Sequence, residues 1–132
     1  MLAYLDSSFI VRYLTNDPPT MAEQAAVVID SEQPLLVSTL ILAESAYVLS
    51  SVYQIPRADV VDALTEFLQR TNIQLTQLAK PVALDALQLC KNSKRVSFAD
   101  ALLWAEVFSS TNQQVYTFDK RFPASGIKIL GG

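Results

Sequence analysis

The sequence of 132 residues contains no histidine, one cysteine (Cys90) and three glycines, at positions 126, 131 and 132. Without histidine or a second cysteine, the chain cannot form a zinc cluster, a Ser-His-Asp triad, a Cys-His pair or an internal disulfide. Glycines confined to the C-terminal end exclude GxGxxG and Walker-type loops, which need glycines early in a strand–loop–helix unit. Any catalytic chemistry therefore rests on carboxylates, hydroxyls, lysine or a hard metal ion.

An excess of basic residues is also missing. The chain has ten Lys and Arg against thirteen Asp and Glu, for a formal net charge of −3. It is therefore not a globally basic nucleic-acid binder, and a polyanion has to meet a local basic patch or a metal ion. There is no apolar run of about 18 residues to span a membrane and no basic N-terminal segment of a signal peptide. With its single cysteine, we expect a cytoplasmic protein.

The apolar pattern predicts one domain, residues 1–132, in which strands and helices alternate. Hydrophobic residues make up 51% of the chain, which suffices for a buried core. Short apolar runs predict strands at Leu2–Leu5, Leu35–Val37, Ile73–Leu75, Val115–Phe118 and Ile127–Leu130. Helical spacing and capping signals predict helices over 7–14, 21–30 (capped by Thr20), 38–52 (capped by Ser38 or Thr39), 56–70, 81–90 and 97–109 (capped by Ser97). Such a chain is typical of a three-layer α/β/α sandwich with a mostly parallel sheet of four or five strands.

Four carboxylates lie in apolar surroundings. Asp6 ends the first predicted strand, Asp119 follows the fourth, Glu44 is the only charged residue between Leu35 and Pro56, and Asp100 lies near a helix start. Each also has an ordinary explanation, as a helix cap, a turn residue or a first-turn residue favoured by the helix dipole.

Taken together, these acids indicate a site, because ligands of such folds bind at the carboxyl ends of the strands. We expect all four to converge on one edge of the sheet. Like charges this close repel unless a proton or a cation neutralises them, and oxygen ligands alone suit Mg²⁺ or Mn²⁺. The chemistry indicated is metal-assisted hydrolysis of a phosphodiester.

The pattern resembles the PIN domain, and more narrowly the VapC-type toxins of bacterial and archaeal toxin–antitoxin pairs. The similar segments are Tyr4–Ile10, Val37–Glu44, Phe98–Leu102 and Thr117–Phe122, in that order, across nearly the whole chain. The resemblance implies an endoribonuclease that depends on Mg²⁺ or Mn²⁺. It implies Asp6 and Asp100 as the main metal ligands, with Glu44 and Asp119 completing the catalytic pocket directly or through water.

The resemblance also implies partners and neighbours of the site. Ser8 and Thr117 match positions where the family often has a hydroxyl near the metal, whereas Ser97 stands where many relatives carry a further acid. The implied partners are structured RNA, a small antitoxin protein that blocks the cleft, and a second copy of the chain.

Six basic residues lie near the acidic segments in the sequence. They are Lys91, Lys94 and Arg95 before Asp100, and Arg12, Lys120 and Arg121 after the first and last acids. A short run of charged residues usually forms a solvated loop. Because these residues lie beside the acidic segments, contacts to RNA phosphates are an equally good interpretation.

Other functions remain open at this stage. A receiver-type signalling domain needs an Asp after the third strand, where Ile73–Thr76 has none, and a haloacid-dehalogenase-like phosphatase needs Asp-x-Asp where residues 6–8 read Asp-Ser-Ser. A PIN-like module that binds RNA or protein without catalysis, or a DNA-directed nuclease, fits the same residues. Apolar positions such as Val60 and Leu64 also lead us to expect that the second, third and fourth helices form the dimer or antitoxin surface.

Overall fold

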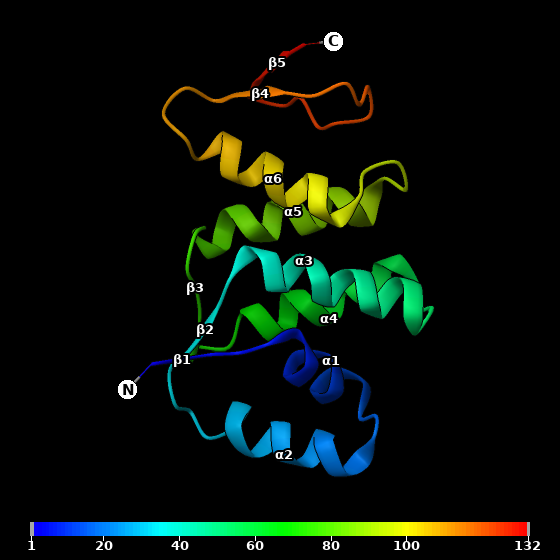
Figure 1. Cartoon of the computed structure of the whole chain (residues 1–132), viewed down its shortest axis with the longest axis vertical. Coiled ribbons are helices and arrows are strands. Elements are labelled where there is room, and N and C mark those ends of the chain that lie inside the picture. The colour runs from blue at the N-terminus through cyan, green and yellow to red at the C-terminus, as the bar shows by residue number, and fades with distance from the viewer. Residues whose placement is uncertain (1, 132) are drawn as a thin grey trace.

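Short strands alternate with helices along the chain (Figure 1). The structure is a computed structural model and describes residues 2–131. The strands are β1 (Ala3–Tyr4), β2 (Leu35–Val37), β3 (Ile73–Leu75), β4 (Gln114–Tyr116) and β5 (Lys128–Leu130). The helices are α1 (Ser7–Thr15), α2 (Pro19–Ile29), α3 (Thr39–Tyr47) with its π-helical continuation η1 (Val48–Val52), α4 (Arg57–Leu68), α5 (Lys80–Asn92) and α6 (Phe98–Phe108). The predicted class of fold, helices with a mostly parallel sheet, is confirmed.

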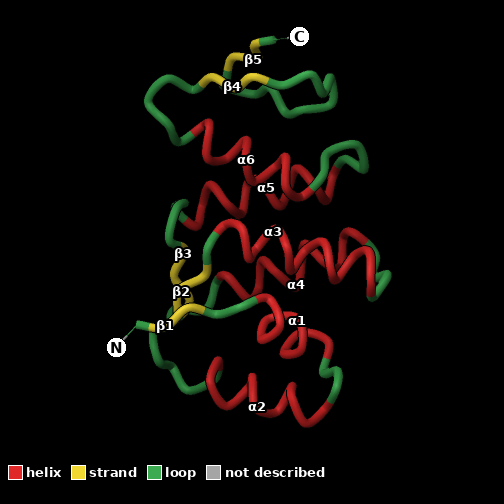
Figure 2. The backbone as a smooth tube through the Cα atoms, in the orientation of Figure 1, coloured by secondary structure: helices red, strands yellow, loops and turns green. Residues whose placement is uncertain are grey.

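Hydrogen bonding divides the strands into two groups within residues 2–131. One sheet has the order β1-β2-β3 and the other pairs β4 with β5, and every pairing is parallel. The number and direction of the strands agree with the sequence analysis, but β4 and β5 lie at the far end of the molecule, beyond α5 and α6 (Figures 1 and 2). An apolar run identifies a strand without specifying its neighbour, so the sequence alone could not indicate this separation.

A continuous hydrophobic core joins the first sheet to the helices. Leu35 and Val37 of β2 and Ile73 of β3 are at most 1% exposed. The helices contribute Ile10, Leu42, Leu64, Leu87 and Leu102 to the same core. Phe122, beyond β4, is buried in it as well, which fastens the C-terminal segment to the helices. No helix within the described residues is long and apolar enough to cross a membrane.

The apolar side chains that suggested a partner surface on α4 lie in the core, and the partner surface itself stays a prediction. The apolar side chains of α4, Val60, Val61, Leu64, Phe67 and Leu68, are at most 2% exposed. The helix packs against α5 and also contacts α3 and β3, so these residues are covered by the protein itself. Apolar positions on more than one face of α4 therefore reflect neighbours on more than one side.

Helix caps follow the sequence in three of four cases. Asp6, Ser38 and Ser97 cap α1, α3 and α6 through their side chains. The predicted cap at Thr20 is wrong, because α2 begins at Pro19, two residues before the predicted start at residue 21. A proline is favoured at the first helical position, since its missing N–H has no partner within the helix.

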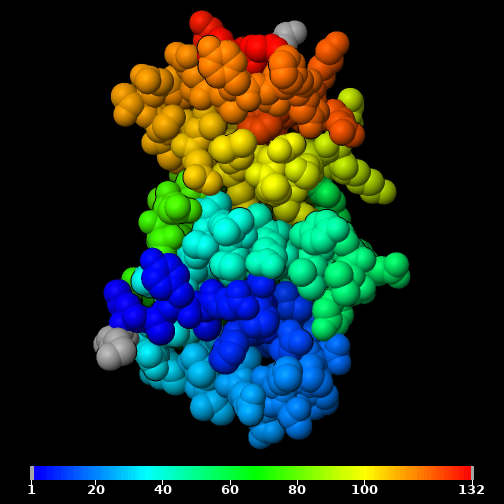
Figure 3. Space-filling view, viewed as in Figure 1, coloured from blue at the N-terminus to red at the C-terminus, as the bar shows by residue number. Residues whose placement is uncertain are grey.

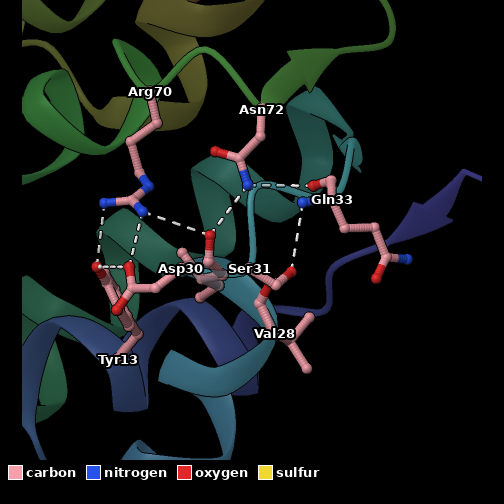
Figure 4. A network of polar contacts seen from close by, with 8 residues as sticks. Tyr13, Val28, Asp30, Ser31, Gln33, Arg70 and Asn72 are labelled. Carbon is pink, nitrogen blue, oxygen red and sulfur yellow. Dashed lines mark hydrogen bonds and ion pairs between the residues drawn. The ribbon is translucent and has the colours of Figure 1, made fainter.

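A buried asparagine fastens the loop after α2 to the start of β3 (Figure 4). The Asn72 Nδ2 donates to the carbonyl oxygens of Ile29 (3.0 Å) and Gln33 (3.1 Å). The backbone carbonyl of Asn72 accepts from the N–H of Leu35 at 2.8 Å. One residue thus holds the end of α2 and the beginning of β2 in register with β3.

A partly exposed charged network lies beside Asn72 (Figure 4). The Nη2 of Arg70 pairs with Oδ1 of Asp30 at 2.7 Å, and its Nη1 donates to the hydroxyl of Tyr13 at 3.2 Å. That hydroxyl donates to Asp30 at 2.7 Å, and burial raises the pKa of Tyr13, helped by this bond. The network ties α1, α2 and the end of α4 together.

Replacing Asn72 by Ala should lower the free energy of unfolding by about 1–3 kcal/mol, because two carbonyls lose their donor in a buried place. Urea denaturation monitored by circular dichroism measures this loss. The control is Lys91→Ala, which breaks an exposed ion pair with Asp62 (2.7 Å) and should cost less than about 1 kcal/mol. Equal losses in the two variants would contradict the role given to Asn72.

Cys90 should be unreactive in the folded protein. The side chain is 0% exposed, and burial raises the pKa of its thiol, so little thiolate is available. An aromatic disulfide reagent at about pH 8 should label the native chain at least about tenfold more slowly than the chain in denaturant. Rapid labelling of native protein would show that this part of the core opens readily.

Candidate active site

Asp6 lies at the end of β1 and caps the first turn of α1. Its Oδ2 accepts hydrogen bonds from the Ser8 hydroxyl (2.8 Å) and the Ser8 backbone N–H (3.3 Å). These two bonds, the hydroxyl first, lower the pKa of Asp6 below its ordinary value. The carboxylate is exposed and ionised at neutral pH, and the role expected for the Ser8 hydroxyl beside a metal ion stays a prediction.

Asp100 and Asp119 lie beside each other in the C-terminal part of the chain. Asp100 belongs to the first turn of α6, where its backbone N–H donates to the Ser97 hydroxyl at 3.0 Å. The backbone N–H of Asp119 donates to the Thr117 hydroxyl at 3.0 Å, just beyond β4. The Arg121 backbone N–H, 2.8 Å from Asp119 Oδ1, is the main cause of the lowered pKa of Asp119, and the neighbouring Asp100 carboxyl contributes to it.

Glu44 is exposed on α3. The adjacent residue, Ala43, lines a hollow of about 230 Å³ between α3 and α6, together with Ala99 and Leu102. Glu44 thus belongs to the helix that packs against α6, the helix carrying Asp100.

The four predicted acids are not gathered in one copy of the chain. Within residues 2–131, no three Asp, Glu, Cys or His side chains lie close enough to hold a metal ion. Asp100 and Asp119 come together, but Asp6 and Glu44 do not join them in such a group. The reason is topological, since Asp6 follows a strand of the first sheet and Asp119 follows a strand of the second.

The chemistry of the Asp100–Asp119 pair suits a hard cation. Carboxylate oxygens are the ligands that Mg²⁺ and Mn²⁺ prefer, and Mg²⁺ often binds through one or two carboxylates while keeping several waters. Both side chains are only half-buried, so the pair is open to solvent and to a bound phosphate.

The basic residues before α6 lie in an exposed loop. Lys94 and Arg95 are exposed between α5 and α6, close in sequence to Asp100. Lys91, the third predicted contact, pairs with Asp62 of α4 at 2.7 Å. Two of the three charges are therefore on the loop that leads to the Asp100 helix.

The other predicted RNA contacts are divided between the ends of the molecule. Lys120 is exposed beside Asp119, and the Arg121 Nε lies 3.5 Å from Asp119 Oδ1. Arg12 belongs to α1, where its Nε lies 3.1 Å from the Met21 Sδ. The structure does not bring all six residues into one basic surface, because Arg12 belongs to α1, which lies away from α6 and β4 (Figure 1).

Arg57 is a cation near the site that the sequence analysis missed. Its guanidinium lies 4.7 Å from the centre of the Phe98 ring, and its Nε donates to the Cys90 carbonyl. It lines a hollow of about 250 Å³ with Ser97 and Ala99 at the start of α6. The available signal was a basic residue directly after Pro56, at a predicted helix start.

The chain matches the family described as PIN domain over residues 3–127, which include all four acids. No curated protein sequence matches the chain. The match agrees with the order of the strands and helices along the chain and with the nuclease chemistry indicated by the carboxylates.

Two substitutions distinguish the stability contributed by the capping hydrogen bonds of Asp6 from that contributed by its negative charge. Asp6→Ala should lower the free energy of unfolding by about 1 kcal/mol, whereas Asp6→Ser keeps a capping oxygen and most of the stability. Because the folded pKa of Asp6 is depressed below its ordinary value of 3.8, its ionic contribution is present above that value. That contribution is lost as the pH falls through the folded pKa.

The difference between wild type and Asp6→Ala should therefore shrink between about pH 7 and about pH 3, measured by urea denaturation at each pH. A difference that stays constant over this range would show that the carboxylate charge contributes nothing to the cap.

Proposed function

The chain belongs to the PIN domain family, and from this premise we propose that it is a divalent-cation-dependent endoribonuclease, the toxin of a type II toxin–antitoxin pair. PIN domains are generally nucleases, which supports a hydrolase of phosphodiester bonds. The proposed partners are structured RNA and a small antitoxin protein that covers the acidic site.

The observation that carries the proposal is the pair of carboxylates at the start of α6 and the end of β4. Asp100 and Asp119 would hold Mg²⁺ or Mn²⁺, which supplies Lewis acidity to the scissile phosphate when bound. Ser97 and Thr117 orient the two acidic segments through their bonds to the backbone N–H groups. Lys94, in the exposed loop before α6, is placed to contact an RNA phosphate.

A PIN domain that binds without catalysis is the second candidate. The separation of Asp6 and Glu44 from the other two acids favours it, since the described residues place no third acid with the Asp100–Asp119 pair. The two candidates differ in turnover, which the following experiment measures.

Purified chain, free of any bound antitoxin, should cleave total cellular RNA into discrete fragments with Mg²⁺ or Mn²⁺ and not with EDTA. Asp100→Asn and Asp119→Asn keep the shape of the side chain and remove its charge, and each should reduce the cleavage rate by at least about 100-fold. The matched control is Glu106→Gln, an exposed acid on the same helix, which should cleave as wild type does.

Intact RNA from folded wild-type protein would favour the binding module. Cleavage that persists in EDTA would overturn the metal dependence. Single-stranded DNA as a parallel substrate distinguishes an RNA-directed from a DNA-directed nuclease.

A further inference from the structure

The start of α6 borders a hollow of about 250 Å³ whose lining contains one charged group, the guanidinium of Arg57. We propose that this hollow binds a phosphate group of the RNA backbone that flanks the cleaved one, with Arg57 as its main ligand. The binding of RNA there rests on the proposed function as well, whereas the affinity of the hollow for a phosphate group does not.

Arg57 is a half-buried cation without an acidic partner. Its Nε donates to the carbonyl of Cys90, and its guanidinium lies 4.7 Å from the centre of the Phe98 ring. Within residues 2–131 no carboxylate forms an ion pair with it, and its Nη2 is buried without a hydrogen-bond partner. A charge removed from water is costly unless it is paired, so the free side of this guanidinium fits an anion.

The stacking on Phe98 leaves Arg57 able to bind such an anion. The ring contacts the face of the guanidinium, and the N–H groups at the edge stay free to donate, apart from the Nε that Cys90 occupies. Other basic residues are already compensated, in the ion pairs Arg70–Asp30, Lys91–Asp62 and Arg121–Asp119.

Hydroxyl groups supply the other polar side chains of the hollow. Its lining consists of Ala43, Tyr47, Ser50, Ser51, Arg57, Ser97, Phe98 and Ala99, with four hydroxyls and no carboxylate. The Ser50 hydroxyl already donates to the Ala46 carbonyl at 2.9 Å. The Ser97 hydroxyl accepts from the Asp100 N–H at 3.0 Å and keeps its own hydrogen for a ligand. Charge-assisted bonds from an arginine together with hydroxyl donors suit the oxygens of a phosphate.

An irregular helical turn forms one wall of the hollow. Beyond α3 the chain continues as η1, where the Tyr53 N–H bonds to the carbonyl of Val48, five residues earlier, at 3.1 Å. Ser50 and Ser51 belong to this turn. π-helical turns are rare and occur frequently at functional sites. The irregular turn thus lies at the place where the proposed ligand binds.

The hollow adjoins the candidate active site. α3 and α6 pack side by side, with η1 and the start of α6 at the same end of the pair (Figure 1). In Figure 3 the cyan-to-green atoms of α3 and η1 adjoin the yellow atoms of α6. Ala99 lines the hollow, and Asp100 is the next residue of the same helical turn. Because one turn rises only about 5.4 Å, ligands at the hollow and at Asp100 would be neighbours.

The charges around the hollow favour a nucleic acid. Lys94 and Arg95 are exposed in the loop that leads to α6. Two acids, Glu44 on α3 and Asp100 on α6, lie on the helices beside the hollow, but neither lines it. A backbone with one phosphate per nucleotide can contact the basic loop, the hollow and a cation at Asp100 in succession, which a single carboxylate of an acidic peptide cannot do.

Inorganic phosphate tests the hollow without any turnover. In EDTA, at constant ionic strength, it should shift the NMR signals of the Arg57 Nε–H and of the backbone amides of Ser97–Ala99 until they saturate. Arg57→Gln should abolish the saturable amide shifts. Lys128→Gln, which removes a positive charge from an exposed position on β5, should retain them. Wild-type protein without saturable shifts, or saturable shifts that survive in Arg57→Gln, would overturn the proposal.

RNA binding is measured by the fluorescence anisotropy of a short single-stranded oligoribonucleotide, again in EDTA. Arg57→Gln should weaken binding at least about tenfold and reduce the slope of log Kd against log salt concentration by about 0.7, the loss of one phosphate contact. Lys128→Gln should change neither value. Equal effects of the two variants overturn the assignment to RNA, as does an acidic peptide that displaces phosphate from the hollow where the oligoribonucleotide does not.

A second variant leaves the contacts of Arg57 with Cys90 and Phe98 intact. Ser51→Asp adds a negative charge to the lining of the hollow and should weaken both phosphate and RNA binding at least about tenfold. The matched control is Ser109→Asp, which adds the same charge at the opposite end of α6 and should bind as wild type does. Circular dichroism verifies that each variant is folded. Folded Ser51→Asp protein with wild-type affinities contradicts the proposed site.

Steady-state kinetics distinguish this proposal from the proposed function. In Mg²⁺, Arg57→Gln should raise KM at least about tenfold and change kcat less than about threefold, because a flanking phosphate is held equally before and during cleavage. Phosphate and RNA that bind through Arg57 without any cleavage refute the nuclease and leave the phosphate site standing. Cleavage with an unchanged KM in Arg57→Gln refutes the phosphate site and leaves the nuclease standing.

Discussion

The central position of β2 between β1 and β3 fixes the N-terminal two-thirds of the molecule. Leu35 lies opposite Ala3 on one side and Ile73 on the other, and Asn72 holds both the start of β2 and the end of α2. Because parallel strands need a crossover between them, each step from one strand to the next carries a pair of helices, α1 and α2 or α3 and α4. The carboxyl ends of the strands then open toward the starts of α1 and α3. Asp6 and Ser38 lie there as helix caps.

The C-terminal third of the chain is positioned by helix packing instead of by pairing with the first sheet. α6 is held by α5 and α3, and the segment that follows it returns over α6 instead of reaching the first sheet. Asp100, at the start of α6, and Asp119, just beyond β4, consequently lie beside each other, while Asp6 stays with the first sheet. The chain thus keeps apart charges whose close approach in one copy would cost free energy in the absence of a cation.

Much of this arrangement could be predicted from the sequence. The apolar runs identified all five strands, and the hydroxyls at Ser38 and Ser97 identified two helix starts. Local signals of this kind depend on residues a few positions apart. Whether β4 pairs with β1 or lies in a separate sheet depends on residues more than a hundred positions apart, and no local sequence pattern predicts it. The apolar pattern at Val60 and Leu64 suits the core as well as a partner surface, and α5, the helix that packs against α4, comes later in the chain.

In the candidate site too, contacts between residues close in sequence could be predicted, whereas contacts made by packing could not. Ser8 beside Asp6 and Thr117 beside Asp119 follow directly from spacing, because each pair is two residues apart. Arg57, by contrast, reaches the start of α6 only through the packing of α4 on α5.

The contact between Arg121 and Asp119 affects how the carboxylate can bind a cation. The arginine is a tethered counter-ion that lies 3.5 Å from the carboxylate. Because exposed ion pairs are weak, a divalent cation held by Asp119 would compete with this guanidinium, and the freed arginine would then be available to a phosphate.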